Sequence, residues 1–249
     1  MQSLLQKKVV VLGGSRGVGR VIAQTLNAAG AHVMAVARNQ DALMLLTQQK
    51  PKIETLVLDV TEERAPEAVF ERMRPDALVV CAGAKRTGSP FYELEWSEFA
   101  ETWDIDVKAS FLFCRAAIQR PLPHGAVIIL ISSCAALGGS PISGGYAGAK
   151  RMQMFLANYA QKESDRLGLG LRFLAVTPMR PMVDTEGGRA AVASYTKYLG
   201  ISAEEFVKGM DAPQTAQDVA NAVLSFVATP PDRACNVFIV SGKGVEALK

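Results

Sequence analysis

A serine pair, a tyrosine and a lysine lie close together in the sequence, at positions where their chemistry can be combined. Tyr146 and Lys150 are four residues apart, so on a helix they share one face. A phenol with its ordinary pKa of about 10 is a weak acid–base catalyst at neutral pH, and a nearby ammonium favours its ionised form. Ser132 and Ser133 end an apolar run, where a hydroxyl can donate to a reacting oxygen. The alternative is an ordinary helix with a solvated lysine, because the Tyr-x-x-x-Lys pattern alone is short.

A glycine-rich segment near the N-terminus separates an apolar run from a helical pattern. Its spacing, Gly13-x-x-x-Gly17-x-Gly19, differs from GxGxxG and lacks the Lys-Ser/Thr of a nucleoside triphosphate loop. Small residues let the backbone approach a pyrophosphate, and the helix N-terminus that follows favours negative charge. The alternative is a glycine-rich turn without a ligand, but the position between the first strand and the first helix favours the ligand. The expected contacts are Gly13, Ser15, Arg16, Gly17, Val18 and Gly19.

Two arginines indicate which dinucleotide would bind. NAD-binding domains usually place an acid about 20 residues after the glycines, where it holds the ribose 2′-hydroxyl. Residues 31–40 contain no acid, and Arg38 stands where the acid is expected. Arg38 and Arg16 together suit a 2′-phosphate through charge-assisted bonds, which predicts NADP(H). Either arginine alone would more simply be a solvated surface residue.

The elements that must position these residues alternate along the chain. Seven nearly continuous apolar runs predict strands at 8–13, 32–37, 55–60, 77–83, 126–133, 172–178 and 236–242. Helical patterns between them include residues 20–30, 41–51 and 215–231. This alternation predicts a single α/β domain over residues 1–249, with a doubly wound parallel sheet and helices on both faces. A polar segment at about 180–213 is expected near the ligand-binding edge.

Composition excludes several other classes of protein. The chain is 49% hydrophobic, and its net charge of +3 is scattered without a basic run, so nucleic acid binding has no support. No stretch reaches the length of about 18 apolar residues that a membrane helix needs, and we expect no signal peptide. The four cysteines lack metal-ligand spacing, so no metal is expected and a cytoplasmic location with reduced thiols is the simplest expectation.

Taken together, these motifs resemble the short-chain dehydrogenase/reductase family over essentially the whole chain. The matching marks are the glycine loop, Asp59 in "LDV", Ala82 and Gly83 in "CAGA", Ser133, and the Tyr146–Lys150 pair. The resemblance implies a seven-stranded Rossmann sheet and hydride transfer at the nicotinamide C4. It implies that Tyr146 exchanges a proton with the substrate, that Ser133 orients the substrate oxygen, and that Lys150 also holds the nicotinamide ribose. The cofactor contacts it implies outside the loop are Arg38, Asp59, Val60, Ala82, Gly83, Tyr146, Lys150, Pro178 and Thr185.

The chain departs from the family pattern at several positions. Asp106 occupies the place of a fourth catalytic residue, an asparagine that in the family holds a proton-relaying water. A carboxylate there adds negative charge near Lys150, so we expect activity with a shifted pH optimum. Met179 replaces the usual glycine after Pro178, and the segment before Thr185 is two residues longer. Leu12 and Cys81 also replace the usual threonine and asparagine, which affects mainly local hydrogen bonds.

Two hypotheses of function follow. The first is an NADP(H)-dependent oxidoreductase that interconverts a ketone and a secondary alcohol, with 3-oxoacyl-carrier, sugar, steroid and xenobiotic ketones all open as substrates. The second is a catalytically weak NADP(H)-binding sensor or scaffold on the same fold. Aromatic residues on two helices, among them Trp96, Phe111 and Tyr159, are expected mainly in the core. The resemblance also implies a homotetramer or homodimer through these helices.

Overall fold

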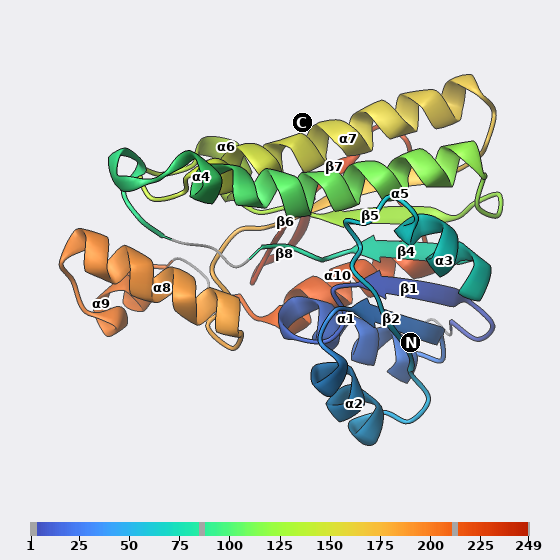
Figure 1. The fold of residues 1–249 in the computed structure, drawn as a ribbon, viewed down its shortest axis with the longest axis horizontal. Coiled ribbons are helices and arrows are strands. Elements are labelled where there is room, and N and C mark those ends of the chain that lie inside the picture. Colours follow the sequence, from blue (N-terminus) through green and yellow to red (C-terminus); the bar gives the residue numbers. More distant parts are fainter. Residues whose placement is uncertain (1–3, 85–87, 211–213, 249) are drawn as a thin grey trace.

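The computed structural model describes residues 4–84, 88–210 and 214–248, and it shows one twisted sheet between two layers of helices (Figure 1). Within the described residues the sheet has eight strands in the order β3-β2-β1-β4-β5-β6-β7-β8. The strands are β1 (Lys8–Leu12), β2 (His32–Ala37), β3 (Glu54–Val57), β4 (Ala77–Val80), β5 (Val127–Ile131), β6 (Arg172–Pro178), β7 (Val237–Ser241) and β8 (Gly244–Ala247). The order reverses between β1 and β4, which is the topological switch point of a doubly wound fold.

Each strand of the sheet's centre sends alternate side chains into two separate cores. In β1, Val9 and Val11 pack in one core, and Val10 and Leu12 pack in the other. The first core is covered by α1 (Gly17–Ala28), α2 (Gln40–Gln49) and α10 (Ala216–Ala228). The second is covered by α3 (Ala65–Arg72), α5 (Lys108–Gln119) and α7 (Gly145–Arg166). Burial on both faces explains why the strands read as continuous apolar runs, so that interpretation is confirmed.

The remaining helices lie at the carboxyl edge of the sheet or next to it. They are η1 (Phe91–Glu93), α4 (Trp96–Thr102), η2 (Trp103–Val107), α6 (Ala135–Gly138), α8 (Glu186–Leu199) and α9 (Ala203–Lys208). In Figure 1, α8 and α9 project together beyond the carboxyl ends of the strands. They form the greater part of the segment predicted at about 180–213, whose residues 211–213 lie outside the described structure.

The structure corrects the predicted sheet in two respects. Seven strands are parallel as expected, but β8 adds an antiparallel strand beside β7, with Ser241 opposite Gly244. No apolar run in the sequence predicted β8, because all four of its residues are exposed. Several predicted strands also end earlier than expected: β4 stops at Val80 and β5 at Ile131. The residues beyond these ends belong to the loops that line the pocket described below.

Several aromatic residues on α4, α5 and α7 are less buried than expected. Trp96 is 76% exposed, and Phe111 and Tyr159 are also exposed, whereas Phe113 on α5 is fully buried. Core packing was therefore the wrong prediction for Trp96, Phe111 and Tyr159. None of the helices in the described ranges is both long and apolar enough to cross a membrane.

Candidate active site

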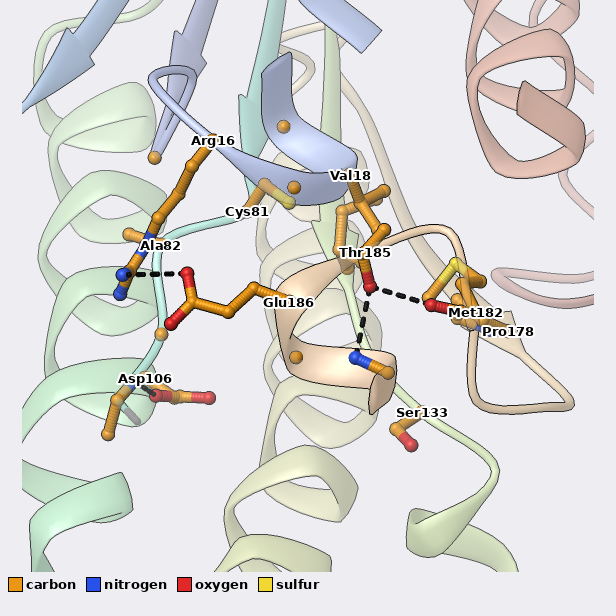
Figure 2. Close-up of a pocket in the computed structure, with 18 of the residues that line it drawn as sticks. Arg16, Val18, Cys81, Ala82, Asp106, Ser133, Pro178, Met182, Thr185 and Glu186 are labelled. Atoms are coloured by element: carbon orange, nitrogen blue, oxygen red, sulfur yellow. Dashed lines mark hydrogen bonds and ion pairs between the residues drawn. The ribbon is translucent and has the colours of Figure 1, made fainter. Parts of the chain in front are cut away.

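An open pocket of about 710 Å³ lies at the carboxyl edge of the sheet, between the glycine turn and α8 (Figure 2). Its size suits a ligand as large as a dinucleotide together with a small substrate. Every residue predicted for the site lines it: Gly13, Ser15, Arg16, Gly17, Val18, Gly19, Arg38, Asp59, Val60, Ala82, Gly83, Asp106, Ser133, Tyr146, Lys150, Pro178 and Thr185. The fold thus brings together residues spread over more than 170 positions of the sequence.

The glycine turn is shaped by close backbone contacts. Gly13 has φ +79°, and a Cβ at Gly19 would lie 2.2 Å from the Gly13 carbonyl oxygen, so a side chain cannot be accommodated there. Helix α1 begins directly after Arg16, whose side chain makes no capping hydrogen bond, and its first turn contains no acid. A helix N-terminus without a side-chain cap beside a pocket favours an anion. This chain's own residues therefore fit the pyrophosphate of a dinucleotide.

The two predicted phosphate-binding arginines each contact a carboxylate in this structure. Arg38 Nη1 lies 3.6 Å from Asp59 Oδ2, and Arg16 Nη1 lies 3.5 Å from Glu186 Oε2 on α8. Both guanidinium groups are more than 60% exposed, so these ion pairs are weak and leave the arginines able to bind an added phosphate. Figure 2 shows the Glu186 side chain pointing toward Arg16 across the pocket.

Asp59 is also held by its own loop. Its Oδ1 accepts hydrogen bonds from the Thr61 amide and the Thr61 hydroxyl. Burial raises the pKa of Asp59, but these bonds and the charge of Arg38 lower it by more, so the net pKa lies below its ordinary value. Asp59 is therefore an ionised acceptor at the edge of the pocket, able to accept a hydrogen bond from a ligand amino group.

Lys150 is fully engaged by acceptors from three elements. Its Nζ lies 3.0 Å from Asp106 Oδ2 and donates to the Ile131 carbonyl at 3.0 Å and to Gln153 Oε1 at 3.1 Å. The three bonds match the three donors of an ammonium group. Burial lowers the pKa of Lys150, but the charges of Asp106 and Tyr146 raise it by more, so the net pKa lies above its ordinary value. Lys150 is therefore a fixed cation, 5.5 Å from the centroid of the Tyr146 ring.

Asp106 links this cation to the loop that follows β4. Its Oδ1 accepts the Ala84 amide at 2.7 Å, and a Cβ at Gly83 would lie 3.0 Å from its Oδ2. Asp106 lies in η2, a π-helical turn between α4 and α5, and its side chain is 1% exposed. Such turns often occur at functional sites because they re-aim a side chain. Asp106 therefore forms a direct ion pair with Lys150 at the position where the family pattern has an asparagine.

Gln153 is a buried partner of Lys150 that the sequence reasoning missed. It is fully buried on α7, and its amide donates to Ser110 Oγ at 2.8 Å and to the Asp106 carbonyl at 3.5 Å. These bonds orient its oxygen toward Lys150. A signal was present in the sequence: positions 146, 150 and 153 share a helix face, and a polar residue on a core-facing stripe needs a partner.

The two neighbouring serines have different environments. Ser132 is buried, and its hydroxyl donates to the Lys150 carbonyl at 2.8 Å. Ser133 accepts the Ala135 amide at 3.3 Å, and its side chain projects into the pocket (Figure 2). Its O–H can therefore donate to a substrate oxygen, which separates a structural serine from a candidate catalytic one. Beside Gly19, burial raises the pKa of the Cys81 thiol to about 11, so this cysteine stays protonated.

Thr185 lies in the pocket, but its hydroxyl is engaged locally. It donates to the Met182 carbonyl at 2.8 Å and accepts the Gly188 amide at 3.0 Å, which makes it the N-cap of α8 (Figure 2). The preceding loop is held by buried Gln214, whose oxygen accepts the Met179 and Arg180 amides. Nothing in the sequence indicated Gln214, because its partners Met179, Arg180 and Val240 lie 26 to 35 residues away.

Known proteins resemble this chain in sequence and in structure. Residues 7–194 match the family model described as short chain dehydrogenase. L-xylulose reductase from Homo sapiens is 32% identical over 53% of this chain and 55% of its own length. An uncharacterized oxidoreductase from Mycobacterium tuberculosis is 31% identical over 91% of this chain and 86% of its own length. The crystal structure of gox2181 has the same fold, with a TM-score of 0.75 and 20% identity over 91% of this chain and 90% of that one. The alignment spans about half the length of the L-xylulose reductases.

Proposed function

Because the chain belongs to the short-chain dehydrogenase/reductase family, we propose that it is an NADP(H)-dependent oxidoreductase that interconverts a ketone and a secondary alcohol. The observation that carries the proposal is the buried Lys150 ammonium, 5.5 Å from the Tyr146 ring centroid, in the same pocket as the glycine turn and Ser133. A scaffold has no need of a buried cation beside a phenol. We further propose that residues 1–249 act as one catalytic unit.

Each residue of the site has a chemical task in this proposal. Ser133 donates a hydrogen bond to the carbonyl oxygen and shares the negative charge that develops on it during reduction. Tyr146 gives its proton to that oxygen, and in the reverse direction its phenolate accepts the alcohol proton. Lys150, held by Asp106 and Gln153, stabilises the phenolate through its charge. The nicotinamide, when bound, supplies or accepts the hydride.

The glycine turn and the two arginines support NADP(H) as the cofactor. Both arginines line the pocket, and neither is deeply buried, so a 2′-phosphate can bind them without displacing core contacts. Arginine suits a phosphate because its planar fork can donate two parallel bonds. Asp59 and the loop after β4 would then contact the adenosine half of the cofactor. Segment 180–213 supplies α8 and α9 as the cover of the substrate.

We also propose that the chain assembles as a homotetramer or homodimer through the exposed aromatic residues of α4, α5 and α7. Trp96 stacks on Phe99 at 5.6 Å, and Phe155 stacks on Tyr159 at 6.0 Å. Aromatic residues that remain exposed on neighbouring helices are typical of an interface. Replacing Trp96 with glutamate should lower the native mass measured by light scattering, whereas an unchanged mass would place the interface elsewhere.

The direct test is NADPH oxidation over a panel of ketones, with Tyr146→Phe as the inactive comparison. We expect turnover by the natural chain and a loss of at least 100-fold in kcat for the variant, because general acid–base catalysis contributes roughly 10²–10⁴-fold. Equal rates for the two proteins on every substrate would refute the catalytic assignment. Tight NADPH binding without turnover of any ketone would favour the sensor or scaffold instead.

A further inference from the structure

Helix α8 extends along the pocket from the cofactor side to the substrate side. At its start, Glu186 contacts Arg16 of the glycine turn. Nine residues later, or about 13 Å along the axis, the Tyr195 hydroxyl lies 2.9 Å from Ser140 Oγ. Ser140 belongs to the segment between Ser133 and Tyr146. The second half of α8 is therefore close to the segment that carries the proposed catalytic residues, and it forms one wall of the substrate space.

The pocket face of this wall changes from small residues to aromatic ones along the helix. After Glu186 at the start of α8, the next lining residues of the helix are small: Gly187, Gly188, Ala190 and Ala191. Farther along, Tyr195 lines the pocket and stacks on Phe206 of α9, with ring centroids 5.4 Å apart and planes 12° from parallel. The stacked rings of Tyr195 and Phe206 form an aromatic wall of the substrate space.

Among the described residues, several others that line the pocket also lack strong hydrogen-bonding side chains. They are Cys134, Ala135, Gly139, Met179, Pro181 and Met182. Ser133 and Tyr146 are assigned to the reacting oxygen, and the Tyr195 hydroxyl is bonded to Ser140. Arg180 also lines the pocket, and a planar guanidinium can stack on a flat ring as well as bind an anion.

On these observations, and resting on the proposed function, we propose that the substrate is an apolar, ring-containing ketone that packs against Tyr195 and Phe206. A sugar ketone carries several hydroxyls, and each would lose its bonds to water in a space whose described lining offers few partners. A flat apolar ring instead gains contact with Tyr195 and Phe206 at little cost in conformational freedom. The wall thus selects against polyhydroxylated ketones and for flat apolar ones.

The test compares three carbonyl probes with NADPH as reductant: bicyclic 2-tetralone, small and flexible 2-butanone, and the ketopentose xylulose. We expect kcat/KM for 2-tetralone to exceed that for xylulose by at least 100-fold. Phe206→Leu and Tyr195→Leu should raise KM for 2-tetralone about 10-fold while leaving KM for 2-butanone nearly unchanged. Tyr195→Phe, which keeps the ring and loses the bond to Ser140, should retain most of the 2-tetralone affinity.

Tyr198→Leu is the matched control, because Tyr198 lies on the same helix, is exposed, and does not line the pocket. Equal or better turnover of xylulose, or an unchanged KM for 2-tetralone in the Phe206 and Tyr195 variants, would overturn the inference and leave the proposed function standing. Calorimetric binding of the same probes to the protein loaded with NADP⁺ gives a readout without turnover. If xylulose bound as tightly as 2-tetralone in this binding measurement, the inference would be overturned, whether or not any probe is reduced. Failure to reduce any of the probes would count separately, against the proposed function.

Discussion

Replacing Asp106 with asparagine removes a buried negative charge beside the proposed catalytic centre at nearly constant volume. Asp106 uses one oxygen for the Ala84 amide and the other for the Lys150 ammonium. An asparagine has one carbonyl oxygen, so it can keep only one of these two acceptor roles. The substitution therefore tests both the charge and the connection between the β4 loop and Lys150.

The size of the electrostatic effect follows from two distances. Asp106 Oδ2 lies 3.0 Å from Lys150 Nζ, which lies 5.5 Å from the Tyr146 ring centroid. The carboxylate is thus at most about 8.5 Å from the ring, where a unit charge contributes about 2 kcal/mol at an effective dielectric constant of 20. Removing that charge favours the phenolate, so the limb of the pH–rate profile that reports its formation should move about 1.4 units toward acid.

The assay is log kcat/KM for alcohol oxidation by NADP⁺ from pH 6 to pH 10, in the natural chain and in Asp106→Asn. Asp104→Asn is the matched control, because it makes the same chemical change at an exposed position of η2. We expect the acid shift in the first variant alone, together with a loss of stability, because Lys150 stays buried beside a neutral amide. A profile that is unchanged, or that moves toward alkaline pH, would refute the reasoning.

Three further predictions use the same site. Replacing Arg38 or Arg16 with alanine should weaken NADPH binding roughly 10- to 100-fold, because each variant loses charge-assisted bonds to the 2′-phosphate. NADH binding, measured by the same fluorescence titration, should be nearly unchanged. Equal losses of affinity for both cofactors would contradict this role. Gln153→Leu should lower kcat and alter the pH profile, whereas Gln161→Leu, which removes another buried glutamine from α7, should lower stability alone. Because the folded-state pKa of Lys150 lies above its ordinary 10.5, its stabilising contribution is complete below that pH and is lost as pH rises through the folded value. The stability advantage of the natural chain over Lys150→Met in urea should therefore shrink above pH 10.5, and an advantage that grew with pH would contradict the sign.

The sequence predicted the sheet because buried strands and short motifs can each be recognised within a few consecutive residues. The apolar runs required burial on both faces, and the motif residues lay at strand ends, so topology alone brought Gly13, Ser133 and Tyr146 to one edge. Strand β8 could not be found in this way, since its exposed residues carry no apolar pattern. The exposure of Trp96 was also missed, because residue type alone does not distinguish a helix face that packs in the core from one that is exposed.

The contacts around Lys150 show why residue types predict a site better than they predict its geometry. The sequence indicated that Asp106 adds negative charge near Lys150, but a carboxylate there could equally have bound a relay water. The direct pair forms because η2 turns Asp106 inward while Gln153 and the Ile131 carbonyl fix the same ammonium from α7 and β5. These partners come from three elements, so no spacing rule within one element could specify them.

The same arrangement has a consequence for how Lys150 contributes to catalysis. The three N–H donors of Lys150 are taken up by Asp106, Gln153 and the Ile131 carbonyl, so the ammonium acts on Tyr146 through its charge. A hydrogen bond from Lys150 to the nicotinamide ribose would therefore require the release of one of these three acceptors. Asp106 is the strongest of the three because it is charged, so Gln153 is the acceptor whose loss should most easily free a donor. Gln153→Leu should therefore tighten NADPH binding while it lowers kcat, a combination that a general loss of structure cannot produce. Weaker NADPH binding in Gln153→Leu would show instead that the bond to Gln153 holds Lys150 in the orientation that receives the cofactor.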